Sequence, residues 1–114
     1  VQGRDEEGAA KLIADAKALE AAGADMVLVE LIPSWLGKRL TESLTVPTIG
    51  IGAGPHMTGQ VLVLYDILDI TPGRRARFAK NYMQGSKSIR EAVSRFVAEV
   101  KSGEYPAPEH GFDR

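Results

Sequence analysis

The stretch that decides the fold is DMVLVELIPSW, residues 25–35. Its consecutive apolar residues, MVLV, are typical of a parallel β-strand that is covered on both faces. The run ends on an acid, Glu30, and Pro33 then predicts the start of a helix. Glutamate is depleted in strands and is costly to bury without a partner. Glu30 is therefore either an incidental strand end that faces solvent or an acid held at the mouth of a pocket.

The segments on either side alternate between helix and strand. Before the stretch, apolar spacing predicts a helix through residues 9–19, with acids in its first turn and Gly23 as its stop. After it, we expect a helix that begins at Pro33, a strand at PTIGIG (residues 47–52) and another at QVLVLY (residues 60–65). This alternation predicts an α/β fold with a mostly parallel sheet.

The connection between the last two strands, from Gly50 to Gln60, is short, with about ten residues in all. A parallel crossover usually needs about a dozen residues or more. Two arrangements therefore stay open. One is a barrel with an irregular connection, which we favour, and the other is a local antiparallel hairpin.

The last part of the chain predicts two helices and a tail. The segment RRARFAKNYMQ (residues 74–84) indicates a basic helix. SIRE (residues 88–91) matches a capping box, and the apolar spacing after it predicts a final helix that Gly103 stops. The proline-interrupted tail, residues 104–114, is expected to be extended and either docked or disordered.

Composition excludes several classes of protein. The chain has 114 residues, a net charge of -1 and no cysteine. This charge gives no reason to expect nucleic acid or an anionic membrane as a partner, and the lack of cysteine excludes disulfides and thiolate metal sites. No apolar run is long enough to span a bilayer, and no signal peptide is recognised. We expect a cytoplasmic protein with neither nucleic acid nor membrane as a partner.

Two candidate ligand motifs are incomplete. GIGAG (residues 50–54) fails the dinucleotide fingerprint because Pro55 stands at the third glycine position, and Gln60 stands where a P-loop has its lysine. His56 and His110 lack partners at the spacing of metal ligands. We therefore predict no nucleotide loop and no metal site held by this chain alone.

Glu30 is the strongest candidate for a catalytic residue. In parallel α/β folds, ligands bind at the carboxyl ends of the strands. Beside apolar walls at Ile51, Val61 and Val63, desolvation would raise the pKa of Glu30 toward neutrality, which suits a general base acting on a C–H bond. An exposed strand end, or an ion pair with the basic residues 38–39, remains an equal alternative on the pattern alone.

Five motifs of the chain together resemble one family. The chain resembles the carboxyl-terminal half of ketopantoate hydroxymethyltransferase over nearly its whole length. No single motif is decisive, but their ordered combination is specific. The motifs are GADMVLVE (residues 23–30), VPTIGIGAG (46–54), GQVLVLYD (59–66), RFAKNY (77–82) and the tail pattern V-x-SGEYP-x-PEH-x-F (100–112).

The resemblance implies a (β/α)8 barrel, of which residues 1–114 would be the later part, from the end of strand five to strand eight with the carboxyl-terminal helices. It implies transfer of a hydroxymethyl group from 5,10-methylenetetrahydrofolate to 3-methyl-2-oxobutanoate, which gives 2-dehydropantoate in pantothenate biosynthesis. It also implies that Glu30 is the base that forms the enolate. Ile51, Val61 and Val63 would flank the isopropyl group of the 2-oxo acid.

The same resemblance implies that a magnesium ion binds the 2-oxo acid through ligands in the missing amino-terminal half. We therefore expect this chain to be inactive alone and the complete enzyme to be a homo-oligomer. Two other hypotheses remain. One is a carbon–carbon lyase of the phosphoenolpyruvate mutase or isocitrate lyase barrel type, and the other is a non-catalytic assembly module.

Overall fold

The first helix forms where the sequence predicts it. In the computed structural model, which describes residues 1–114, helix α1 spans Glu6–Ala21. The Asp5 side chain caps it by accepting a hydrogen bond from the Gly8 amide at 2.7 Å, so one of the unpaired donors of the first turn is satisfied. Ala9 and Ala16 are the buried positions of its inner face.

The carboxyl end of α1 is bonded to the loop that leads into the second strand. The Glu20 carboxylate accepts hydrogen bonds from the amides of Val46 at 3.0 Å and Thr45 at 2.7 Å. These amide donors lower the pKa of Glu20, because they stabilise the ionised carboxylate. The loop is thereby held against the helix.

Three parallel strands follow in the order β1–β2–β3. They are β1 (Val27–Glu30), β2 (Thr48–Ile51) and the short β3 (Gly59–Gln60). Residues 52–58 connect β2 to β3 without a helix. The antiparallel hairpin is therefore excluded, and the irregular parallel connection is the one that forms.

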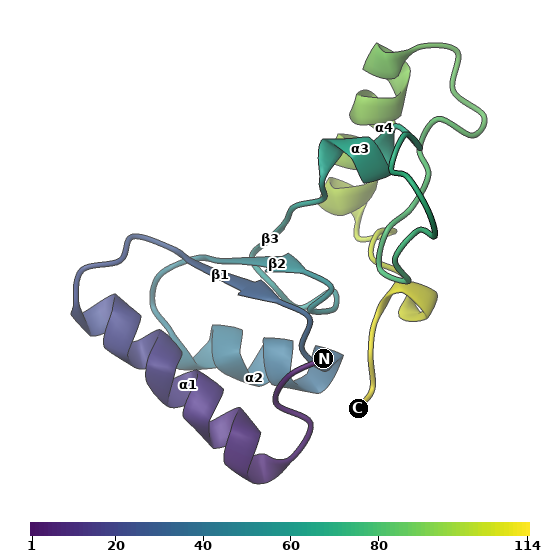
Figure 1. The fold of residues 1–114 in the computed structure, drawn as a ribbon. Helices are drawn as coiled ribbons and strands as arrows, with labels where there is room; N and C mark the ends of the chain where they lie inside the picture. The colour runs from purple at the N-terminus through teal and green to yellow at the C-terminus, as the bar shows by residue number, and fades with distance from the viewer.

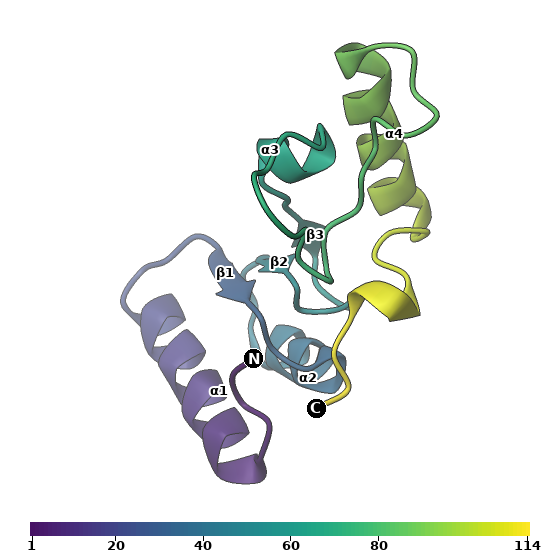
Figure 2. The ribbon, with the colours of Figure 1, turned by 45° about the vertical axis from the view of Figure 1, so that its right-hand side comes forward.

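Helix α2 (Ser34–Ser43) returns the chain from β1 to β2, with Pro33 at its N-cap as predicted. Leu36 and Leu40 are buried on its inner face. Helices α1 and α2 lie beside one another on the same face of the sheet (Figures 1 and 2).

One face of the sheet is packed and the other is open. Burial alternates along β1: Val27 and Val29 are buried, whereas Leu28 is 62% exposed. The prediction of a strand covered on both faces is therefore wrong for this chain, because helices lie on only one side. The first core joins the helices to the covered face and contains Ala9, Ala16, Val27, Val29, Ile32, Leu36, Leu40, Ala53 and Met57.

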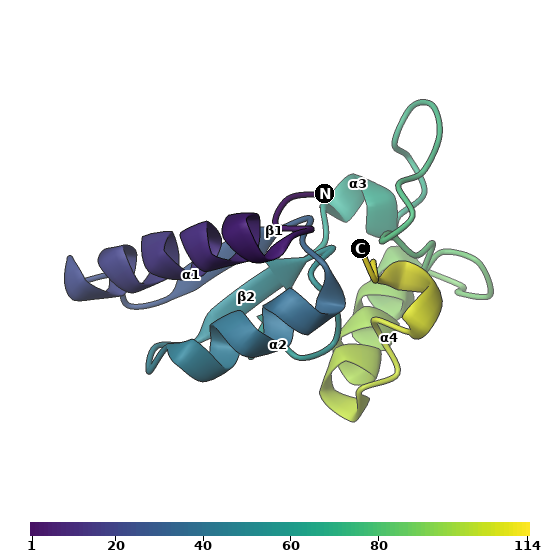
Figure 3. The same ribbon diagram turned by 90° about the horizontal axis from the view of Figure 1, so that it is seen from below.

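A second lobe follows the sheet and carries α3 (Leu64–Ile67), α4 (Ile89–Ser102) and the 3-10 turn η1 (Pro108–His110). Figure 3, seen from below, shows α4 away from the α1–α2 layer, in keeping with principal extents of 44 × 26 × 24 Å. None of the helices has both the length and the apolar composition that a membrane span requires. The second core contains Leu62, Ile67, Tyr82, Ala92 and Tyr105.

The ends of α4 are those that the sequence predicts. The Ser88 side chain accepts a hydrogen bond from the Glu91 amide at 3.0 Å, while the Glu91 carboxylate accepts one from the Lys87 amide at 3.3 Å. Gly103 ends the helix in the left-handed conformation at φ 85°. The capping interaction thus forms, but the Glu91 carboxylate accepts from the amide of Lys87 rather than from the amide of the N-cap residue Ser88.

Two predicted elements are wrong. QVLVLY is not one strand, because pairing with β2 ends soon after Gln60 and Leu64 begins α3. Residues 74–84 form turns rather than a basic helix. Tertiary bonds favour this irregular path: Tyr82 donates its amide to the Ile67 carbonyl at 3.0 Å, and its own carbonyl accepts from Arg95 at 2.9 Å.

The tail docks against the start of α2. The amide of Ser34, at the start of α2, donates to the Phe112 carbonyl at 2.7 Å. Arg77 stacks over the Phe112 ring at 5.3 Å and donates to the Glu109 carbonyl at 3.3 Å. The open choice between a docked and a disordered tail is therefore resolved in favour of docking.

Gly37 supports a specific prediction about α2. A Cβ at this position would overlap the Ala53 carbonyl oxygen and lie 3.1 Å from the Met57 sulfur. We expect Gly37→Ala to lower the free energy of unfolding by roughly 1–3 kcal/mol through overpacking. This value is the net change, after the gain in helix propensity of about 1 kcal/mol has been subtracted.

Urea unfolding followed by circular dichroism measures this change. Lys38→Ala, on the exposed side of the same helix, is the control and should leave the midpoint nearly unchanged. A Gly37→Ala chain at least as stable as the parent would contradict the close contact.

Candidate active site at the carboxyl ends of the strands

The strand register places three of the four predicted site residues in one row. Glu30 pairs with Ile51, and Gln60 pairs with Gly50, so that Val61 stands opposite Ile51. The Val61 amide donates to the Gly50 carbonyl at 3.0 Å, which extends the pairing to this row. Register partners project from the same face of a sheet, so these side chains share the face that no helix covers.

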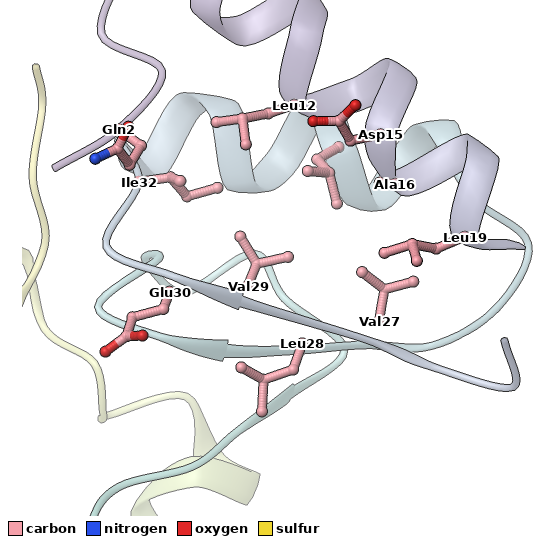
Figure 4. Close-up of a pocket in the computed structure, with 11 residues that line it drawn as sticks. Gln2, Leu12, Asp15, Ala16, Leu19, Val27, Leu28, Val29, Glu30 and Ile32 are labelled. Carbon is pink, nitrogen blue, oxygen red and sulfur yellow. The ribbon is translucent and has the colours of Figure 1, made fainter.

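The close-up view shows this division of the two faces. In Figure 4, Val27 and Val29 project toward the helices, whereas Leu28 and Glu30 project from the opposite side of β1. We call the residues of the uncovered side the open face: Leu28, Glu30, Ile49, Ile51 and Val61.

The surroundings of Glu30 differ from those predicted. Glu30 is exposed, Val61 is 38% exposed, and Val63 is 53% exposed at the N-cap of α3, beyond the paired residues. Ile51 is half-buried and packs against the second core. The apolar enclosure predicted around Glu30 is therefore not formed by this chain, because the second lobe covers Ile51 but leaves Glu30 exposed.

The ion-pair alternative for Glu30 is excluded by the partners of the two nearby basic residues. Lys38 pairs with Glu42 at 4.0 Å, and Arg39 pairs with Glu6 at 3.0 Å. Both pairs lie on exposed helix surfaces. Glu30 is thus a carboxylate without a basic partner, at the end of the strand that the register aligns with Ile51.

Two cavities flank the sheet. The first, about 180 Å³, lies between α1 and β1 at the free edge of the sheet and is mostly apolar, with Glu30 and Gln2 at one end (Figure 4). The second, about 240 Å³, is mostly polar and lies between the β2–β3 connection and the tail, lined by Ser34, Pro55, His56, Pro106, Ala107, Pro108, Gly111 and Asp113.

The residues of this chain do not fit a magnesium site of their own. Magnesium takes oxygen ligands in a near-octahedral arrangement, usually with one or two protein carboxylates. No group of three or more His, Asp or Glu side chains converges in the chain. Glu30 offers one carboxylate on the open face.

His110 organises the tail from a buried position. Its Nδ1 atom accepts the Ala107 amide at 3.0 Å, and its ring lies 5.0 Å from the Tyr105 ring. Burial lowers the pKa of His110 below its ordinary value, while the charge of Glu109 acts in the opposite direction. A neutral ring is required here, because protonation would place a hydrogen on the accepting nitrogen.

A half-buried ion pair lies beside this tail. Lys80 donates to Glu99 at 2.6 Å, and the Tyr82 hydroxyl donates to the same carboxylate oxygen at 3.2 Å. Burial and the negative charge of Glu99 raise the pKa of Tyr82. These groups connect α4 to the irregular segment and are bonded to one another, so we interpret them as structural.

The comparisons with known proteins decide the family. The model of the family described as ketopantoate hydroxymethyltransferase matches residues 1–108. The chain belongs to the ketopantoate hydroxymethyltransferase family. It is 54% identical over 112 residues to 3-methyl-2-oxobutanoate hydroxymethyltransferase 2 of Burkholderia lata, covering 98% of this chain and 41% of that protein. A relative of the same enzyme name from Cupriavidus necator is 56% identical over 112 residues, with the same two coverages.

The chain spans about two fifths of the length of the ketopantoate hydroxymethyltransferases that it matches. The family match confirms the predicted resemblance. The parallel sheet with its helices confirms the predicted α/β architecture. The sequence did not reveal Leu31 as a special position, although it adopts φ 53° directly after Glu30. A leucine carries no sequence signal for this conformation, which glycine and asparagine favour.

His110 leads to a prediction about pH. Its folded-state pKa lies below the ordinary value of 6.5, so above pH 6.5 its contribution to stability is fully present. As the pH falls below 6.5 the unfolded chain binds a proton that the folded state resists. The free energy of unfolding should therefore decrease until the lowered folded-state pKa is passed.

Urea unfolding between pH 8 and pH 5 (about the range in which histidine titrates) measures this dependence. His110→Gln should flatten it, because the amide oxygen can accept the Ala107 proton without titrating. His56→Gln, in the exposed loop, is the matched control and should keep the parent slope. An unchanged slope in His110→Gln would contradict the assignment.

Proposed function

We propose that this chain supplies the base-bearing part of a 3-methyl-2-oxobutanoate hydroxymethyltransferase. The enzyme would transfer a hydroxymethyl group from 5,10-methylenetetrahydrofolate to 3-methyl-2-oxobutanoate and give 2-dehydropantoate for pantothenate synthesis. Glu30 is the residue to which we assign removal of the C3 proton. The supporting observation is its unpaired carboxylate at the carboxyl end of β1, in register with Ile51, in a chain of this family.

The open face supports a place for the substrate. Ile51 and Val61 stand in the same row as Glu30 and offer apolar contacts for the two methyl groups of the 2-oxo acid. Val63, exposed at the start of α3, would contribute a third contact. A carboxylate next to apolar side chains is partly desolvated once the face is covered, and desolvation strengthens a carboxylate as a base.

The chemistry assigned to the chain is one proton transfer. The Glu30 carboxylate takes the proton from C3, and the electron pair of that C–H bond forms the new carbon–carbon bond to the one-carbon unit of the folate. Over the whole reaction, both bonds from this carbon to the folate nitrogens break, and a water molecule supplies the hydroxyl oxygen. The C3 proton and the remaining proton of that water are left on the two nitrogens of tetrahydrofolate. The carboxylic acid thus formed must return its proton before the next turnover. The chain's own residues therefore hold the base and the apolar walls.

The remaining parts of the site are proposed to come from outside residues 1–114. The family resemblance implies magnesium, for which this chain offers no convergent ligand set. The open face also exposes apolar residues that a complete barrel would cover. We therefore propose that the rest of a (β/α)8 barrel encloses Glu30 and carries the metal ligands, and that this chain is inactive without it.

A chimera tests the role of Glu30. In it, this chain replaces the matching two fifths of the Burkholderia lata relative. We expect Glu30→Gln to slow solvent deuterium exchange at C3 of 3-methyl-2-oxobutanoate by about 10²–10⁴-fold, the usual contribution of a general base. Binding of the 2-oxo acid should change little, because the amide keeps the size of the side chain.

Glu42→Gln is the matched control, since it makes the same chemical change at an exposed helix position. It should leave deuterium exchange unchanged. Normal exchange in Glu30→Gln would refute the base assignment. Cleavage of a 2-hydroxy diacid by the parent chimera without folate would favour the lyase instead.

A further inference from the structure

The residue after Glu30 has an unusual backbone. Leu31 adopts φ 53°, a left-handed conformation that a branched side chain rarely takes. In a regular strand, the amide and the carbonyl of one residue point to the same neighbouring strand. At Leu31 they point to opposite sides.

The hydrogen bonds show this reversal directly. The Leu31 amide donates to the Ile51 carbonyl in β2 at 2.9 Å, whereas the Leu31 carbonyl accepts from the Gln2 amide at 2.8 Å. The next amide, that of Ile32, donates to the Gly52 carbonyl at 3.2 Å, so two consecutive amides bond to β2. This bulge-like arrangement ends regular pairing directly after Glu30, and bulges of this kind re-aim side chains near active sites.

The side chain of Leu31 also fixes this residue, because it packs over Gly52 beside Phe78. A Cβ built on Gly52 would lie 3.1 Å from Leu31 Cδ2 and 3.0 Å from Phe78 Cδ1, so both side chains occupy the space over Gly52. Phe78 belongs to the second lobe, where its carbonyl accepts a hydrogen bond from the Tyr105 hydroxyl. Leu31 is therefore fixed by the segment before α1, by β2 and by the second lobe.

We propose that Leu31 is a positioning residue: its left-handed conformation, held between Gln2 and β2, sets the direction of the Glu30 carboxylate on the open face. Figure 4 shows Gln2 and Ile32 at the same end of β1 as Glu30. The inference rests on the proposed role of Glu30 as the base. It assigns the reactive orientation to a backbone conformation rather than to a side chain that touches substrate.

Two substitutions separate conformation from packing. Leu31→Val keeps an apolar side chain, but its branched Cβ resists positive φ, whereas Leu31→Asn loses the apolar contact and accepts positive φ readily. In the chimera, we expect Leu31→Val to slow C3 deuterium exchange by about tenfold or more, as misplacement of a catalytic group does. KM for the 2-oxo acid should change little. Leu31→Asn should retain most of the parent exchange rate.

The matched control makes the same two changes at Asp69, the other non-glycine residue with positive φ, at 58°. Asp69→Val and Asp69→Asn should alter the unfolding midpoint without altering C3 exchange. The reverse order at position 31, with the valine variant active and the asparagine variant slow, would show that Leu31 only packs and would overturn the proposal. If Leu31→Val does not fold, the exchange rate of Leu31→Asn decides alone. A rate close to that of the parent supports the proposal, and a slow rate overturns it.

The test also separates failure of this inference from failure of the proposed function. If the parent chimera shows no C3 exchange, the proposed function fails, and hydrogen–deuterium exchange of the Gln2 amide then tests Leu31 alone. Protection that is lost in Leu31→Val and kept in Leu31→Asn supports the bond between Gln2 and a left-handed Leu31. Equal protection in both variants overturns it.

Discussion

Parallel pairing of β1 with β2 is the constraint on which the rest of the structure depends. Because the two strands run in the same direction, their carboxyl ends meet at one edge of the sheet, and α2 must return across one face to connect them. That return covers Val27 and Val29 and leaves Glu30 on the other face. The register with Ile51 then fixes which apolar residue stands beside the acid.

The conformation of Leu31 shows how this arrangement is maintained at the point where pairing ends. A leucine at positive φ costs about 1–2 kcal/mol relative to an ordinary backbone conformation. The hydrogen bonds of its amide and its carbonyl, to opposite sides, offset that cost. In the proposal above, the conformational cost at Leu31 therefore serves to orient the Glu30 carboxylate. Backbone strain is often found at functional sites for this reason.

The sequence predicted the elements whose signals are local and missed those that depend on tertiary contacts. Helix periodicity and capping residues located α1, α2 and α4, because these signals lie within each helix. QVLVLY has the composition of a strand, yet β3 contains only Gly59 and Gln60, and α3 begins at Leu64. Strand β2 ends at Ile51, so it offers no partner to the residues that follow Val61. Glu30 was found from its place after an apolar run, but its exposure depends on what covers the open face, which this sequence does not contain.

The central claim is that the Glu30 carboxylate faces the reacting carbon of a 2-oxo acid on the open face. A crystal structure of the chimera with 3-methyl-2-oxobutanoate bound measures this directly, as the distance from the Glu30 carboxylate to C3. The account predicts a separation of about 3–3.5 Å, the range of a near-attack geometry. A carboxylate turned away from the ligand, with another side chain in contact with C3, would contradict it.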